Sequence, residues 1–327
     1  MSATVLPHRP GVVPARFWRG FAVTLRPYLF FVSGAAGLVG LAAAPPLPLP
    51  AFTLALGAFF ISYGLGQALT DVFQTDTDSI SSPYRPLVRG EISRGAVLLV
   101  SLSGLLLCGL TLALFNPWNL ALSAAAVAGL AAYTPLKRRW WGGPPCNAAV
   151  VALLPAMGFL CVEPSPMRAI TSPILPLATG SVFASYAVFV LLGYLKDVEA
   201  DRATGYATIA VRFGRRTAVL VSGAFGAGSL AASLLLLGRV PGWSASRWPG
   251  VALWLAGAML LVAAHVKALS VRQDAEAFPA VVLSVRSFLA LHLGEVSVLR
   301  PALAPLAIGL LVLFEATLAR RPCQEQI

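Results

Sequence analysis

Long apolar stretches, separated by short polar connections, run through the chain from end to end. A helix needs about 20 apolar residues to cross the ~30 Å hydrocarbon core of a bilayer, and every backbone amide in lipid needs a partner within its own segment. The pattern therefore predicts an all-α polytopic membrane protein, a bundle of about nine transmembrane helices. The apolar runs lie at about residues 21–44, 50–70, 95–114, 119–136, 146–162, 174–195, 216–237, 249–269 and 300–319.

One further apolar stretch, residues 277–294, contains Pro279, Arg286 and His292. We interpret it as an interfacial or packed half-span. An odd number of crossings then places the C-terminus opposite the N-terminus, a placement that Arg320 and Arg321 fit poorly.

The first apolar run is longer than the ~7–15 residues of a signal-peptide core, so we expect it to be retained. The chain is accordingly divided into three parts. They are a basic N-terminal leader on the cytoplasmic side (1–20), a transmembrane domain (21–320) and a C-terminal tail (321–327).

The connections alternate between uncharged and strongly charged segments. Residues 45–50 and 115–119 carry no charge, whereas most charge falls in the N-terminal tail and in residues 71–94, 137–139, 196–216 and 267–276. An excess of Lys and Arg marks cytoplasmic loops. The charged connections are therefore predicted to face the cytoplasm.

The composition supports a membrane protein and excludes an ordinary soluble enzyme. Of the 327 residues, 57% are hydrophobic and 11% are charged, against roughly 45–50% and about 25% in soluble domains. The net charge of +11 does not indicate nucleic-acid binding, because the basic residues lie in clusters between apolar runs. The four cysteines show no paired spacing and are expected to be small core residues.

Aspartate is concentrated after the second and sixth predicted spans, where five of the six Asp residues lie. Carboxylates at the membrane are costly and indicate a functional site by default. Gln67 and Asp71 are one helical turn apart, and Asp78 returns to the same face if the helix continues, whereas Asp76 falls to the side.

In the second segment, Asp197 and Asp201 are again one turn apart on one face. Two such carboxylate pairs repel each other unless a divalent cation lies between them, and Mg²⁺ prefers carboxylates, water and phosphate oxygens. The basic residues interleaved with them suit phosphate binding. These basic residues are Arg85, Arg89, Lys196 and Arg202. The two segments therefore predict a magnesium–diphosphate site.

These motifs resemble those of the UbiA superfamily of intramembrane prenyltransferases. The segment 67–86 is similar to its Asn-x-x-x-Asp-x-x-x-Asp motif followed by Pro-x-Arg-Pro, and 194–202 to its second Asp-x-x-x-Asp motif. Residues 133–138, Tyr-Thr-Pro-Leu-Lys-Arg, resemble a third element of the family. Gln67 stands where the family has Asn, and Thr75 stands at the third carboxylate position.

The resemblance implies a prenyl diphosphate held by Mg²⁺ between the two motifs, and an aromatic or quinone-precursor acceptor that attacks the allylic cation. The implied metal ligands, which include the catalytic carboxylates, are Gln67, Asp71, Asp78, Asp197 and Asp201. Asp76 is an alternative to Asp78 as the metal ligand. We prefer Asp78 because it lies on the same helix face as Asp71. The implied phosphate contacts are Arg85, Lys137, Lys196 and Arg202. Tyr133 and Tyr194 border the motifs, where they either stabilise the carbocation by cation–π attraction or pack in the core.

Two other functions compete with this interpretation. An intramembrane terpene cyclase would use the same site without an acceptor. A transporter needs polar residues or broken helices near the bilayer midplane, and the runs carry little beyond scattered Ser and Thr. We therefore expect an integral membrane enzyme that contacts lipids, binds no nucleic acid and has its active site facing the cytoplasm.

Overall fold

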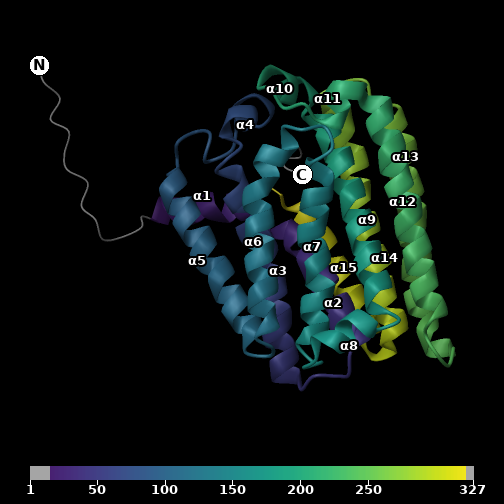
Figure 1. Ribbon diagram of the computed structural model, residues 1–327. Coiled ribbons are helices and arrows are strands. Elements are labelled where there is room, and N and C mark those ends of the chain that lie inside the picture. The colour runs from purple at the N-terminus through teal and green to yellow at the C-terminus, as the bar shows by residue number, and fades with distance from the viewer. Residues whose placement is uncertain (1–14, 322–327) are drawn as a thin grey trace, which may run out of the picture.

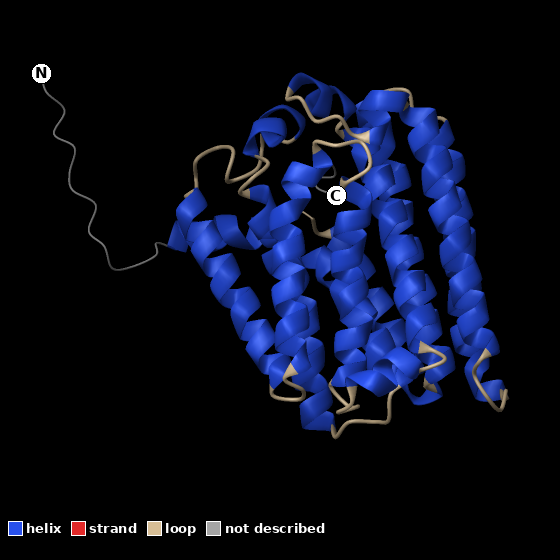
Figure 2. Cartoon of the chain, in the orientation of Figure 1, coloured by secondary structure: helices blue, strands red, loops and turns tan. Residues whose placement is uncertain are grey.

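The computed structural model describes residues 15–321, and this part of the chain is helical without strands (Figures 1 and 2). Most of the predicted leader 1–20 and of the tail 321–327 lies outside the described residues. Arg16 and Arg19 of the leader lie on the first helix, α1 (Ala15–Leu25).

Ten helical stretches of the described chain are long and apolar enough to cross a membrane. The first joins α1 to α2 (Phe30–Ala43). The others are centred on α3 (Leu49–Asp71), α5 (Arg94–Ala113), α6 (Trp118–Lys137), α7 (Gly143–Leu160), α9 (Leu175–Gly193), α12 (Arg215–Gly238), α13 (Trp248–Leu269), α14 (Phe278–Leu299) and α15 (Ala304–Ala319). The prediction of an all-α membrane bundle is confirmed.

The first predicted span is interrupted at Arg26. This residue has a φ of 50°, in the left-handed region, and precedes Pro27 of a short 3₁₀ turn. A proline disfavours helical geometry in the residue before it, so α1 ends here and lies across the direction of the long helices (Figure 1). Phe17 and Phe21 of α1 pack into a cluster with Leu65 and Leu69 of α3.

The half-span predicted for residues 277–294 is wrong, because α14 is a full-length helix buried in the bundle. Its polar residues have partners: Arg286 donates two hydrogen bonds to Glu315 of α15, and His292 Nδ1 lies 2.8 Å from Glu295. An apolar face interrupted by paired polar residues is compatible with a spanning helix.

The full crossing of α14 also reverses the placement of the C-terminal end. α15 returns toward the start of α2, where the rings of Phe314 and Phe31 lie 5.8 Å apart, and its last turn is at the same end of the bundle as Arg26. Arg320 and Arg321 therefore lie on the side that carries the other basic connections, so they agree with the charge rule.

Short helices cover this same end of the bundle. They are α4 (Thr75–Ser81), α10 (Val198–Ala203) and α11 (Ile209–Phe213), whereas α8 (Pro166–Thr171) lies at the opposite end (Figure 1). The polar motifs found in the sequence thus form a cap over one end of an apolar bundle.

Glycines bring α2 and α7 into backbone contact. A Cβ added at Gly40 would overlap the carbonyl oxygen of Pro155 and lie 2.8 Å from the amide nitrogen of Phe159. Small residues at such crossings are what holds helices together in lipid, where apolar burial alone provides no driving force.

We predict that Gly40→Ala lowers the thermal denaturation midpoint of the purified protein, because overpacking of this kind costs roughly 1–3 kcal/mol. The matched control is Gly309→Ala on α15, where an added Cβ has no neighbour within 4 Å. The control should leave the midpoint unchanged or raise it slightly, since Ala favours a helix over Gly. Equal shifts in the two variants would contradict this account of the α2–α7 crossing.

Candidate active site

The two Asp-rich segments meet at one cavity under the polar cap. The cavity is lined at this end by Asp71 from α3, Asp78 from α4 and Asp197 from the turn after α9. The ends of α3 and α9 therefore lie close together and open toward the same side. The convergence expected from the sequence is present in the structure.

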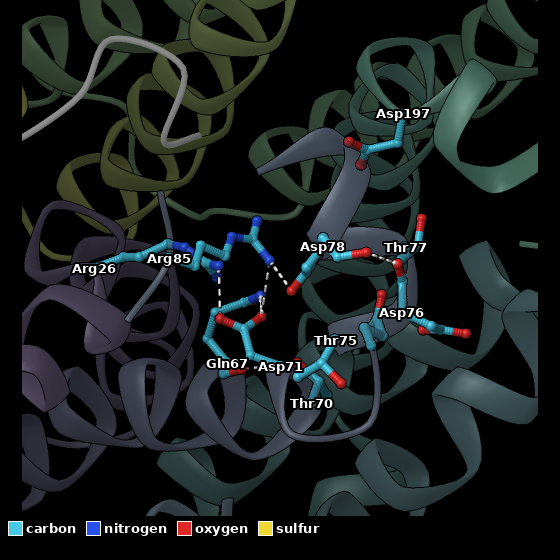
Figure 3. Close-up of polar contacts among 12 residues, drawn as sticks. Arg26, Gln67, Thr70, Asp71, Thr75, Asp76, Thr77, Asp78, Arg85 and Asp197 are labelled. Atoms are coloured by element: carbon cyan, nitrogen blue, oxygen red, sulfur yellow. Dashed lines mark hydrogen bonds and ion pairs between the residues drawn. The ribbon is translucent and has the colours of Figure 1, made fainter. Parts of the chain in front are cut away.

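The carboxylates of the first segment are balanced by arginines. Asp71 Oδ2 lies 2.7 Å from Arg26 and its Oδ1 lies 3.6 Å from Arg85, which also forms an ion pair with Asp78 (Figure 3). The amide of Gln67 donates to Asp71 Oδ1 at 3.4 Å. Arg85 thus bridges the two carboxylates, so one arginine couples the end of α3 to the short helix α4.

The carboxylates of the second segment are balanced by lysines. Lys196 Nζ lies 3.5 Å from Asp197 Oδ2, and Lys137 Nζ lies 3.0 Å from Asp201 Oδ1. Thr77 of α4 donates a hydrogen bond to the same Asp201 oxygen. The other oxygen, Asp201 Oδ2, is buried and has no hydrogen-bond partner in the described structure. Asp201 itself lies behind Lys137 and is not among the residues that line the cavity.

The aspartates differ in how well the surrounding cations offset their burial. Burial raises the pKa of Asp78 despite the neighbouring Arg85, and it raises the pKa of Asp201 to about 6 despite Lys137. At Asp197, burial is outweighed by Lys196, Lys137 and Arg85, so the pKa of this carboxyl lies below its ordinary value. Asp78 and Asp201 therefore have less nearby positive charge than their burial requires, which an added cation would supply.

Asp76 does not reach the cavity. Its side chain is 42% exposed, pairs with Arg138 at 2.8 Å and accepts a hydrogen bond from Tyr206. Figure 3 shows it pointing away from Asp71 and Asp78. Residues two apart on a helix point in different directions, so α4 directs Asp78 inward and Asp76 outward. The structure resolves the open alternative in favour of Asp78 as the residue that lines the cavity.

Arg202, one of the implied phosphate contacts, does not line the cavity either. Its side chain is 57% exposed and lies 2.8 Å from Glu199 on the outer side of α10, not in the cavity. Arg85, Lys137 and Lys196 do line the cavity, as expected from the sequence.

Tyr133 and Tyr194 both line the cavity and are buried. Their hydroxyl oxygens are 3.3 Å apart, and Lys137 Nζ lies 5.4 Å from the centre of the Tyr194 ring. The two rings therefore form part of the wall directly beside the charged residues, and one of them already faces a cation.

Sequence reasoning missed Arg26 and Gln74. Arg26 is 4% exposed and forms the shorter of the two ion pairs of Asp71, while Gln74 Oε1 accepts from Lys137 Nζ at 3.4 Å. The signal for Arg26 was a lone arginine before a proline inside an apolar run. Such a residue is rarely buried without a partner.

The donor set fits a divalent cation that arrives with an anionic ligand. No group of three His, Cys, Asp or Glu side chains in the described part of the chain is close enough to hold a metal ion by itself. The cavity nevertheless presents carboxylate oxygens from Asp71, Asp78 and Asp197 and an amide from Gln67. Mg²⁺ typically uses few carboxylates and completes its shell with water and phosphate oxygens.

Below the charged end, the cavity wall is largely apolar. The side chains here come from α3, α5, α6 and α7 and include Phe59, Leu105, Leu112, Val127, Leu154 and Met157. A charged end that continues into an apolar cavity suits an amphipathic ligand with an anionic head and a hydrocarbon tail.

A model of the UbiA prenyltransferase family matches residues 29–291. A digeranylgeranylglyceryl phosphate synthase of Halobacterium salinarum is 31% identical over 222 residues, which cover 66% of this chain and 76% of that protein. A polyprenyl transferase of Penicillium brasilianum, prhE, is 30% identical over 234 residues, which cover 68% of this chain and 70% of that protein.

Two solved structures share the fold. A UbiA homolog from Aeropyrum pernix K1 matches with a TM-score of 0.69 at 20% identity, over 81% of this chain and 95% of that one. A UbiA homolog from Archaeoglobus fulgidus, solved with GPP and Mg²⁺ bound, matches with a TM-score of 0.62 at 20% identity, over 85% of this chain and 99% of that one.

The ion pair between Lys137 and Asp201 is predicted to be a major stabilising contact. Its side chains are 4% and 0% exposed, so Lys137→Met leaves a buried carboxylate without its cation, at a cost of about 3–5 kcal/mol. The neighbouring pair Arg138–Asp76 is 45% and 42% exposed, and such pairs contribute roughly 0–1 kcal/mol. The thermal denaturation midpoint in detergent should fall clearly for Lys137→Met and little for the control Arg138→Met. Equal shifts in the two variants would show that the buried pair contributes no more stability than the exposed one.

Proposed function

Because this chain belongs to the UbiA prenyltransferase family, and is therefore a multi-pass membrane enzyme, we propose that it transfers a prenyl group from a prenyl diphosphate to an aromatic or quinone-precursor acceptor and releases diphosphate. The observation that carries this proposal is a cavity with paired charges at one end and an apolar wall beyond them. The diphosphate binds at the charged end and the isoprenoid tail extends along the apolar wall.

The cations at the cavity end stabilise the charge that develops when the carbon–oxygen bond of the donor breaks. Arg85, Lys137 and Lys196 exchange part of their contact with aspartate for contact with the diphosphate, and Arg26 holds Asp71 in place at 2.7 Å. Preorganised positive charge at a leaving group is a large source of rate enhancement. A divalent cation, bound through Gln67, Asp71, Asp78 and Asp197, would add positive charge at the same leaving group.

Asp201 acts on the substrate through Lys137 rather than by lining the cavity itself. Its Oδ1 holds Lys137 at 3.0 Å, and its buried Oδ2, which has no hydrogen-bond partner in the described structure, would be available to a bound divalent cation. Tyr133 and Tyr194 separate this charged region from the apolar wall. They exclude water from the allylic cation, which would otherwise be quenched before the acceptor attacks.

The charge balance of the cavity favours an acceptor without a phosphate. Each of the four cations that line the cavity lies within 3.5 Å of an aspartate oxygen; these cations are Arg26, Arg85, Lys137 and Lys196. Arg85 has a second, longer ion pair with Asp71. The diphosphate of the donor already has to compete for these cations. A second phosphate on the acceptor would require further basic residues, and the nearby Arg138 and Arg202 face solvent and pair elsewhere.

A second candidate function follows from the names of the relatives. Several similar proteins are named digeranylgeranylglyceryl phosphate synthase, which favours an acceptor that carries glyceryl phosphate. A terpene cyclase, which needs no acceptor, is the third outcome to be tested.

One experiment separates the three functions. The protein in lipid nanodiscs with Mg²⁺ receives a labelled prenyl diphosphate with no acceptor, with a panel of phenolic acceptors, or with a prenylated glyceryl phosphate. Labelled phenolic product supports the proposal, product from glyceryl phosphate alone replaces it with the second candidate, and hydrocarbon formed without acceptor identifies a cyclase.

The site is proposed to face the cytoplasm. The cavity opens at the end of the bundle where the basic residues of the cap gather, among them Arg138, Arg202 and Arg212. Lys and Arg accumulate on the cytoplasmic side of membrane proteins.

We predict that Asp71→Asn and Asp197→Asn each lower turnover by about 10²–10³-fold, because each removes a carboxylate from the charged end. Asp76→Asn is the control: it has the same chemistry on an outward-facing residue and should change turnover by about fivefold or less. Size-exclusion profiles establish that all three variants fold. Turnover that survives in both Asp71→Asn and Asp197→Asn would reject the site.

A further inference from the structure

An exposed basic and aromatic surface lies at the capped end of the bundle, outside the cavity. Two segments form it, 139–141 between α6 and α7 and 212–216 around the start of α12 (Figure 1). We call it the basic–aromatic patch, and its residues are Arg139, Trp140, Trp141, Arg212, Phe213 and Arg216. The rings of Trp140 and Phe213 pack edge to face with their centres 5.3 Å apart, so the two segments form one surface.

The positive charge of this patch is not neutralised by the protein. Its three arginines are exposed and form no ion pair in the described part of the chain. The adjacent basic residues differ, because Arg138 pairs with Asp76 and Arg215 pairs with Asp274. The stretches 138–143 and 209–217 contain no Asp or Glu. Three unbalanced positive charges on one surface therefore fit an anionic partner.

The aromatic residues of the patch place this charge at the level of the lipid headgroups. Trp140 and Trp141 follow the last turn of α6, and Phe213 precedes the start of α12, so all three lie at the ends of candidate membrane spans. They are 47%, 51% and 48% exposed. Most of the length of α6 and of α12 is exposed, so lipid surrounds this part of the bundle. Tryptophan at such positions inserts between headgroups and acyl chains.

From this combination we propose that the basic–aromatic patch binds an anionic phospholipid of the surrounding leaflet. The arginines bind the phosphate and the charged headgroup, and the aromatic rings pack against the glycerol and the upper part of the acyl chains. A soluble anion would use the arginines alone and leave three large aromatic side chains in water. A phospholipid contacts both kinds of residue, and its binding does not depend on which reaction the cavity catalyses.

The chain segments that carry the patch already contact each other beside the charged end of the cavity. The guanidinium of Arg138 lies 4.1 Å from the centre of the Tyr206 ring, and the Arg138 carbonyl accepts a hydrogen bond from the Ala207 amide at 3.2 Å. A lipid that bridges the two segments adds to this contact. Since a ligand that binds only the folded protein stabilises it, anionic lipid is expected to raise the thermal denaturation midpoint.

The test titrates phosphatidylglycerol or phosphatidylcholine into the full-length protein in a neutral detergent. Native mass spectrometry counts the bound lipids, and the thermal denaturation midpoint is measured on the same samples. The patch variant combines Arg139→Gln, Arg212→Gln and Arg216→Gln. The matched control removes three exposed basic residues at the same end of the bundle, by Lys267→Gln, Arg272→Gln and Arg320→Gln.

An arginine beside an anionic headgroup contributes about fivefold in affinity. Wild type and the control variant should therefore bind phosphatidylglycerol on the order of 100-fold more tightly than phosphatidylcholine, and its addition should raise their denaturation midpoints. The patch variant should bind the two lipids equally and lose this stabilisation. Trp140→Ala should weaken the binding of both lipids, whereas Trp248→Ala, at an exposed tryptophan of the opposite end, should leave both unchanged.

Three results would overturn the proposal. Wild type could bind the two lipids equally, or the patch and control variants could lose the same affinity, which would show a general effect of net charge. Glycerol 3-phosphate could displace phosphatidylglycerol at equal concentration, which would identify a site for a soluble anion. Prenyl transfer enters neither readout, so a failure of this proposal is distinct from a failure of the proposed function.

Discussion

The active end of this protein depends on the pairing of each buried aspartate with a buried cation. Asp71, Asp78, Asp197 and Asp201 lie where chain segments leave an apolar bundle, and the cations that balance them come from four different parts of the chain. An unpaired charge at such a site would be strongly destabilising. The pairs therefore hold α3, α4, α6 and the turn after α9 in one arrangement. They also keep the charges available for exchange with an anionic substrate and a divalent cation.

The membrane explains why these charges share one end. Within lipid, the backbone is satisfied only as helix, so the spans have little freedom to place polar side chains except at their ends. α3 and α9 both run toward the capped end, and their last residues carry the two Asp segments. The substrate geometry follows from the same constraint: an anionic head is bound at the end of the bundle, and an apolar tail has only the interior of the bundle to enter.

Much of this was predictable from helical periodicity. The pattern of four-residue spacing pointed to Gln67, Asp71 and Asp78 on one face and set Asp76 aside, and the structure places those side chains accordingly. Periodicity did not decide Arg202, because α10 is a short helix outside the long spans and its rotation depends on its contacts with α4 and α11. Arg26 was missed because its inward direction comes from a left-handed backbone turn rather than from a helix face.

The prediction that residues 277–294 form a half-span was wrong for a different physical reason. Pro279, Arg286 and His292 were interpreted as obstacles to a transmembrane helix because each was judged alone. In the structure Glu315, 29 residues further on, pairs with Arg286, while Ser185 and Ser181 on α9 complete the contacts of His292 and Glu295. The cost of a polar group in a membrane depends on its partners, and partners on other helices leave no local trace in the sequence. Hydropathy therefore predicts which segments are apolar, whereas the count of crossings and the side of the C-terminal end required the tertiary contacts.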